Sequence, residues 1–241
     1  MSYCLSINTD EGLVLCSASF APSALDNKTI HSNMQRFVWP GNRFITIQYS
    51  GNQLTIDAVL NKIRQDLNSH ATTNLLTTSN LNETVDYIAD ISVKQQKALL
   101  KKHGKSQIYD ANFIVAGQIQ NKAMETLLIY AQGNYIHEPN SSPFLQIGEI
   151  KFGKPILDRI IKRDVSLNTA AHCALVSVDS TIKSNPIAKM QTELVIYKRD
   201  SLEMNAYLLL DENSDFFKNT SSLWDQGITS ALEGLPHFYW E

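Results

Sequence analysis

The sequence predicts an α+β fold in which antiparallel sheets are covered by layers of helices. Three observations predict it. Short apolar runs occur in pairs around turn residues, which is typical of β-hairpins. Stretches with helical periodicity lie between these hairpins, mostly in pairs. Strands do not alternate with single helices, as they do in parallel βαβ folds. Two stacked sheets enclosed by helices in a single domain, residues 1–241, satisfy this order.

The amino-terminal half predicts two hairpins followed by two helices. The second hairpin turns at Pro40-Gly41-Asn42, a sequence that favours a tight turn. The second helix ends in basic residues and Gly104, which suit the carboxyl end of a helix. The predicted strands are 3–7 with 13–19 and 35–39 with 43–49, and the predicted helices are 53–67 and 82–104.

The carboxyl-terminal half predicts a further set of strands, two helices, a last hairpin and a final helix. Pro155 suits the first turn of one helix, and Ser166 or Asn168 is a suitable amino-terminal cap for the next. The predicted strands are 112–119, 125–130, a short 134–137, 192–199 and 206–211, and the predicted helices are 154–162, 167–181 and 214–235.

Composition excludes several classes of protein. The chain has 241 residues, of which 43% are hydrophobic and 19% charged, as in ordinary globular proteins. A formal charge of −3 leaves no basic footprint for nucleic acid. No apolar run approaches the roughly 20 residues of a membrane helix, and no signal peptide is recognised. We therefore expect neither a nucleic acid nor a membrane as a partner.

The cysteines and histidines indicate neither a disulfide framework nor a metal site. Cys4, Cys16 and Cys173 are odd in number, which suits a reducing compartment, so we expect a cytoplasmic protein with buried thiols. The six histidines are scattered without the spacing of metal ligands. We expect no metal and no cofactor.

Ser2 is the candidate nucleophile. A strand-like run starts directly after Met1, and a small second residue usually allows the initiator Met to be removed. Removal would leave Ser2 with a hydroxyl and a free α-amine. These two groups form a complete nucleophile and base, as acyl-transfer enzymes with amino-terminal nucleophiles require. An ordinary amino-terminal serine is the alternative.

Several segments resemble the bacterial proteasome-related proteins called Anbu, the ancestral β-subunit family. The opening Met1-Ser2-Tyr3-Cys4 resembles that family's Met-Thr-Tyr-Cys start. The other segments that carry the resemblance are 113–119, 144–149, 152–159, 174–181 and 195–202. The resemblance covers essentially the whole chain. It implies the four-layer αββα sandwich of proteasome β subunits, assembly into rings or open spirals, and peptidase chemistry on a peptide or protein substrate.

The resemblance also implies roles for three residues. Ser2 matches the family's nucleophile, which is usually Thr. Gly51 matches the glycine whose N–H faces the oxyanion, although a strand-to-helix turn would also explain a glycine there. Asp179 resembles the family's Asp near the amino-terminal amine, with a surface acid at a helix end as the alternative.

Two positions depart from the family pattern. Ala18 stands where the family has Asp, and Asn33 stands where it has Lys. The Lys normally lowers the pKa of nearby amine and hydroxyl groups, and the Asp holds it in place. Asp26 and Lys28, a few residues before position 33, could compensate, with a solvated loop as the alternative. The alternative function is therefore a catalytically impaired ring- or spiral-forming homologue with a scaffolding or regulatory role.

The carboxyl terminus is unusually aromatic. Phe238, Tyr239 and Trp240 follow one another. Exposed, they would indicate a contact between subunits. Packing on the chain's own surface is the alternative.

Overall fold

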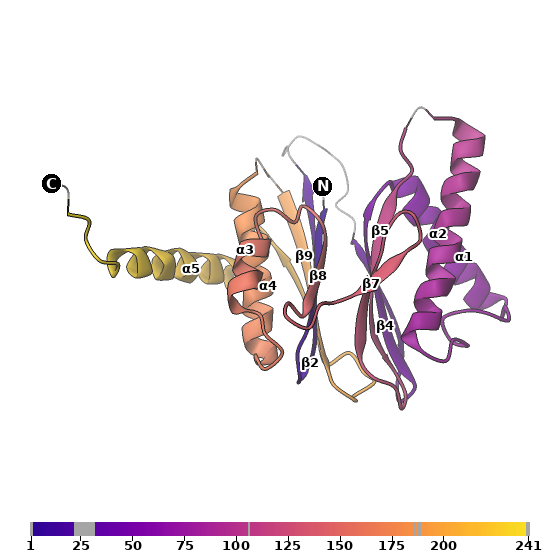
Figure 1. Ribbon diagram of the computed structural model, residues 1–241, viewed down its shortest axis with the longest axis horizontal. Helices are drawn as coiled ribbons and strands as arrows, with labels where there is room; N and C mark the ends of the chain where they lie inside the picture. The colour runs from indigo at the N-terminus through magenta and orange to yellow at the C-terminus, as the bar shows by residue number, and fades with distance from the viewer. Residues whose placement is uncertain (1, 22–31, 106, 186, 188, 240–241) are drawn as a thin grey trace.

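The computed structural model of the chain describes residues 2–21, 32–105, 107–185, 187 and 189–239. Within these residues the chain forms ten strands and five helices (Figure 1). The strands are β1 (Ser2–Asn8), β2 (Gly12–Ala21), β3 (Met34–Trp39), β4 (Arg43–Gly51), β5 (Ala111–Ile119), β6 (Glu125–Ile129), β7 (Tyr135–His137), β8 (Phe144–Gly148), β9 (Lys189–Lys198) and β10 (Ala206–Asp211). The helices are α1 (Gln53–Asn68), α2 (Leu81–His103), α3 (Lys154–Ile160), α4 (Leu167–Lys183) and α5 (Asp215–Glu233).

The strands form two antiparallel sheets. The first, sheet A, has the order β10-β9-β2-β1-β8, and the second, sheet B, has the order β3-β4-β5-β6-β7. β1 therefore has a hydrogen-bonded neighbour on each side. The prediction of antiparallel sheets with helices outside them is confirmed.

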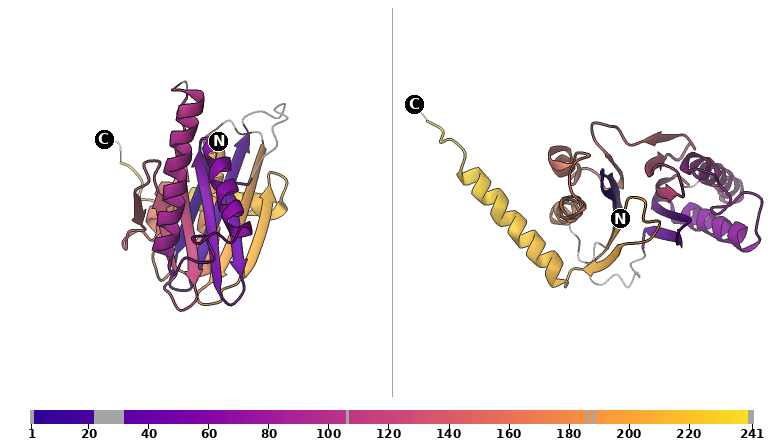
Figure 2. Two further views of the ribbon diagram at one scale, coloured as in Figure 1. Left: turned by 90° about the vertical axis from the view of Figure 1, so that its right-hand side faces the viewer. Right: turned by 90° about the horizontal axis from the view of Figure 1, so that it is seen from below.

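Apolar side chains attach a pair of helices to the outer face of each sheet. Leu157 of α3 and Leu175 of α4 pack in one cluster with residues of β1 and β2. Val59 of α1 and Ile88 of α2 pack in another cluster with residues of β4 and β5. Figure 1 accordingly shows α3 and α4 beside sheet A, and α1 and α2 beside sheet B. α5 extends away from both sheets (Figure 2).

The inner faces of the two sheets meet in smaller apolar clusters, which contain Leu15, Phe44 and Tyr197 in one and Cys4 and Ile147 in the other. A buried polar contact also joins the sheets. The side-chain amide of Gln48 on β4 donates to the carbonyl of Leu5 at 3.1 Å and to that of Cys16 at 2.7 Å.

One strand was not predicted. β8, Phe144–Gly148, follows a Ser-Ser-Pro turn and has only five residues, too few for a clear pattern. It becomes a strand because it pairs with β1, about 140 residues away in sequence. The other predicted strands and helices are confirmed within a few residues of their ends.

The predicted burial of the thiols is also confirmed: Cys4, Cys16 and Cys173 are buried and free. Among the described residues, no helix is long and apolar enough to span a membrane. The same residues contain no group of three His, Cys, Asp or Glu side chains suited to a metal ion.

Removing the amide of Gln48 should weaken the contact between the sheets. We expect Gln48→Met to lower the free energy of unfolding by about 2 kcal/mol, because two buried carbonyls lose a donor. Urea denaturation at one fixed protein concentration measures this. Gln65→Met, on an exposed face of α1, is the matched control. An equal loss in the two variants would contradict the bridging role of Gln48.

Candidate functional site

Ser2 lies at the start of β1, half-buried, with its side chain directed toward sheet B. Its hydroxyl donates to the hydroxyl of Ser50 on β4, with 3.0 Å between the two oxygens. In the register of β1 and β2, Ser2 stands opposite Ser19. The candidate site therefore lies where the first residue of β1, in sheet A, meets the end of β4, in sheet B.

The backbone at the end of β8 holds Ser2 in place. Gly148 has φ +85°, and a Cβ there would lie 2.1 Å from the carbonyl oxygen of Ser2. The next residue, Glu149, donates its N–H to that oxygen at 2.9 Å. Only glycine permits so close an approach at this φ.

Gly51 ends β4 directly after Ser50, so the chain brings it close to Ser2. Its φ is +129°, and a Cβ there would lie 2.4 Å from the carbonyl oxygen of Asp110. Asn52 then caps α1 by accepting from the N–H of Thr55. The turn from strand to helix thus requires glycine at position 51 for a structural reason of its own.

The two positions that depart from the Asp and Lys pattern are both neutral. Ala18 is fully buried in the apolar cluster between sheet A and α4, on the side of the sheet opposite the Ser2 hydroxyl. Asn33 donates its side-chain amide to the hydroxyl of Ser19. Asp26 and Lys28, which could have compensated, lie outside the described residues.

Asp179 has its ion pair with Lys183, one turn later on α4, at 3.0 Å. Lys183 also binds Asp225 of α5 at 2.6 Å. Burial alone would lower the pKa of Lys183, but the two carboxylates outweigh it and raise that pKa. Within the described residues, no hydrogen bond or ion pair joins Asp179 to Ser2.

Cys4 lies two residues from Ser2 but is poorly suited to act as a nucleophile. Its thiol is fully buried, and burial raises its pKa to about 12. The neighbouring hydroxyl of Ser17 and the charge of Glu193 have smaller effects on this pKa. Because the thiolate is the reactive form, Cys4 stays inert at neutral pH.

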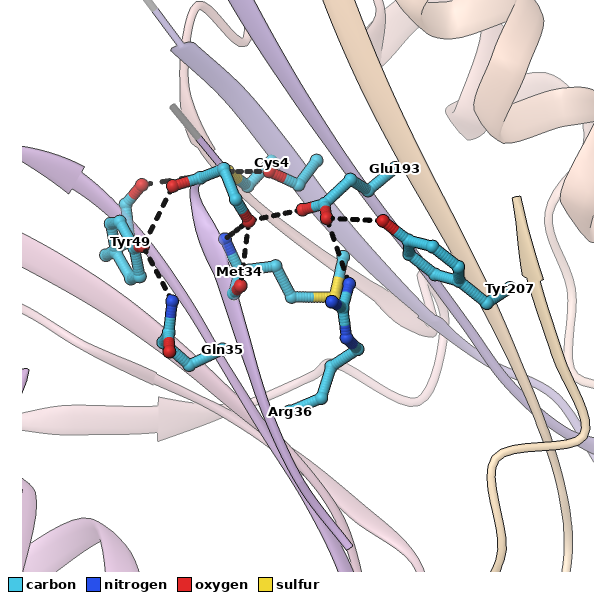
Figure 3. Close-up of polar contacts among 9 residues, drawn as sticks. Cys4, Met34, Gln35, Arg36, Tyr49, Glu193 and Tyr207 are labelled. Carbon is cyan, nitrogen blue, oxygen red and sulfur yellow. Dashed lines mark hydrogen bonds and ion pairs between the residues drawn. The ribbon is translucent and has the colours of Figure 1, made fainter. Parts of the chain in front are cut away.

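Sequence reasoning missed two components of this region. Ser50 was visible only as the residue before Gly51, and nothing in the sequence indicates that its hydroxyl meets that of Ser2. Glu193, which is buried, binds Arg36 and Tyr207 (Figure 3) and also accepts from the hydroxyl of Ser32. Ser32 and Glu193 are 161 positions apart, a separation that no local pattern bridges.

Comparison with solved structures gives full-length matches. Anbu from Yersinia bercovieri is 27% identical with a TM-score of 0.88, and the match covers 99% of each chain. A Gly-1 mutant of Anbu from Hyphomicrobium sp. strain MC1 is 29% identical with a TM-score of 0.90, over 100% of each chain. The structure described as the helical assembly of the Anbu complex from Pseudomonas aeruginosa is 32% identical with a TM-score of 0.89, over 98% of each chain.

No family model matches the chain. No curated protein matches its sequence either. The structural matches nevertheless cover 98% to 100% of the chain. At 32% identity over nearly the whole length, the chain belongs to the Anbu, or ancestral β-subunit, family.

Proposed function

We propose that the protein is a proteasome-type peptidase homologue in which Ser2, after removal of Met1, is the amino-terminal nucleophile. One observation supports this most strongly. The Ser2 hydroxyl lies at the half-buried start of a central strand, 3.0 Å from the Ser50 hydroxyl and beside Gly51. The helix pairs outside the two sheets support the four-layer αββα sandwich in one domain. Three free buried thiols are consistent with a cytoplasmic protein.

The proposed reaction is an acyl transfer in which a single residue provides both the nucleophile and the base. The Ser2 hydroxyl oxygen attacks the carbonyl carbon of a peptide bond, and its proton passes to the α-amine of the same residue. The N–H of Gly51 stabilises the oxyanion that forms. Collapse of this intermediate breaks the C–N bond, and the α-amine returns the proton to the leaving amine. Water then hydrolyses the ester on Ser2 in the same way.

The neutral residues around Ser2 favour a second candidate function. With Ala18 and Asn33 in place of a carboxylate and an ammonium, no charged group supports the α-amine from these two positions. Members of such a network act as a unit, so losing two costs little more than losing one. The second candidate is a catalytically impaired homologue whose assembly serves a scaffolding or regulatory role.

We infer that the protein assembles with itself into a ring or spiral through α5, whichever of the two candidate functions it has. This helix carries exposed apolar side chains, with Leu223 67% and Leu232 63% exposed. Phe238 and Tyr239, just beyond it, are 82% and 94% exposed, and the exposure of Tyr239 favours a subunit contact. Trp240, the third aromatic residue, lies outside the described residues. Exposed apolar side chains of this kind often mark protein interfaces, and a similar structure is a helical Anbu assembly.

Covalent labelling separates the two candidate functions. We expect a peptide epoxyketone, which reacts with a hydroxyl and an α-amine on one residue, to add one probe mass to a chain that has lost Met1. Intact-mass spectrometry, followed by peptide mapping, measures the addition and its position. Labelling at Ser2 establishes the nucleophile.

Ser2→Ala is the control for this experiment, because alanine also permits removal of Met1 but provides no hydroxyl. It should remain unlabelled. A wild-type chain that stays unlabelled under the same conditions would contradict the peptidase proposal and support the scaffold.

Charges in place of exposed apolar side chains of α5 should prevent assembly. We expect the double variant Leu223→Glu and Leu232→Glu to shift the protein from a large homo-oligomer to small species in analytical ultracentrifugation, because the apolar contact would have to bury two carboxylates. Ile108→Glu, at an exposed apolar residue far from α5 in sequence, is the matched control and should leave the size unchanged. An unchanged size of the double variant would exclude α5 as the contact.

A further inference from the structure

Glu193 is a buried carboxylate between the two sheets that the proposed acyl transfer does not use. It lies on β9, is 4% exposed and stands opposite Ser17 of β2. One carboxylate oxygen accepts from the guanidinium of Arg36 at 2.9 Å and from the hydroxyl of Tyr207 at 2.8 Å. The other accepts from the hydroxyl of Ser32. Three donors thus satisfy the charge.

These contacts hold both ends of a short segment at the start of β3. Ser32 and Arg36 are its first and last residues, and Asn33 lies between them. The carbonyl of Asn33 accepts from the N–H of Tyr49 at 3.0 Å, and its side-chain amide donates to Ser19. The position of the Asn33 amide therefore depends on a segment that is fastened to Glu193.

The contact between Asn33 and Ser19 lies next to the candidate nucleophile, because Ser19 on β2 is paired with Ser2 on β1. We propose that Glu193 is a positioning residue for Ser2. It holds Ser32 and Arg36 so that the Asn33 amide stays on Ser19, at the site where Ser2 reacts. This inference rests on the proposed function of Ser2.

The cluster of Glu193, Arg36 and Tyr207 has the rigidity that such a role needs. The Arg36 guanidinium lies 4.3 Å from the ring centroid of Tyr207, so it is held by a charge pair and an aromatic face together. β3 and β10 are edge strands of sheet B and sheet A, and the cluster joins these two edges. Burial alone would lower the pKa of Arg36, but the Glu193 carboxylate outweighs it and raises that pKa. The guanidinium of Arg36 therefore stays charged over the whole physiological pH range.

A matched pair of variants tests the proposal. Glu138 is also a buried carboxylate that binds an arginine, Arg163, at 2.9 Å, but it contacts Asn8 at the opposite end of β1 from Ser2. We expect Glu193→Gln to slow epoxyketone labelling of Ser2 on the order of tenfold or more, because a small displacement of a reacting group is costly. Glu138→Gln should label at the wild-type rate.

A second variant separates positioning from a general loss of stability. Ser32→Ala removes the link from Glu193 to the Ser32 end of the segment, next to Asn33, and leaves the link to Arg36 intact. It should therefore slow labelling in the same direction even if Glu193→Gln fails to fold. Asn33→Ala should slow labelling as well, and combining it with Ser32→Ala should add little, because both act through one contact. Wild-type labelling in Ser32→Ala, or slowing factors that multiply in the combined variant, would overturn the proposal.

Crystal structures of the wild type and Ser32→Ala give an independent result. If the wild type is not labelled at all, the proposed function fails, but the structures still test the positioning. The proposal expects the Asn33 amide to leave Ser19 in Ser32→Ala. An Asn33 amide that still lies within hydrogen-bond distance of Ser19 would overturn it.

Discussion

The hydrogen bonding of β1 on both sides is the constraint on which the candidate site depends. β2 pairs with one side of this strand and β8 with the other. A chain terminus usually frays, but here the Ser2 carbonyl accepts from Glu149 and its hydroxyl donates to Ser50. A shift by one residue would turn the Ser2 side chain away from sheet B and toward the helices. The ladder therefore fixes which face of β1 is available for chemistry.

The second property of the site is that the residues at positions 18 and 33, near the candidate nucleophile, carry no charge. Position 18 lies in an apolar cluster and position 33 carries a neutral amide, so the charged groups lie elsewhere. One ion pair, Glu193 with Arg36, joins the sheets at one edge. Another, Asp179 with Lys183, connects α4 to α5 through Asp225. The hydroxyl and the carbonyl of Ser2 form hydrogen bonds with neutral groups, whereas these ion pairs join other parts of the chain.

The fold could be predicted from the sequence where contacts are local. Both early hairpins and all five helices follow from short patterns, such as Asn52 before α1 or Pro155 in α3. β8 could not be predicted this way, because five residues become a strand only through pairing with β1. The same limit applies to the residues of the candidate site. Ser2 and Gly51 were candidates from the sequence, whereas Ser50 and Glu193 acquire their roles only when distant strands meet.

The amino-terminal residue of the native protein tests the central claim most directly. Intact-mass measurement of the untreated chain, purified with its natural start, distinguishes a protein that begins at Ser2 from one that begins at Met1. Our account requires an α-amine on Ser2 and predicts a chain that has lost Met1. A chain that retains Met1 would contradict it, because the hydroxyl fixed at the start of β1 would then have no base on its own residue.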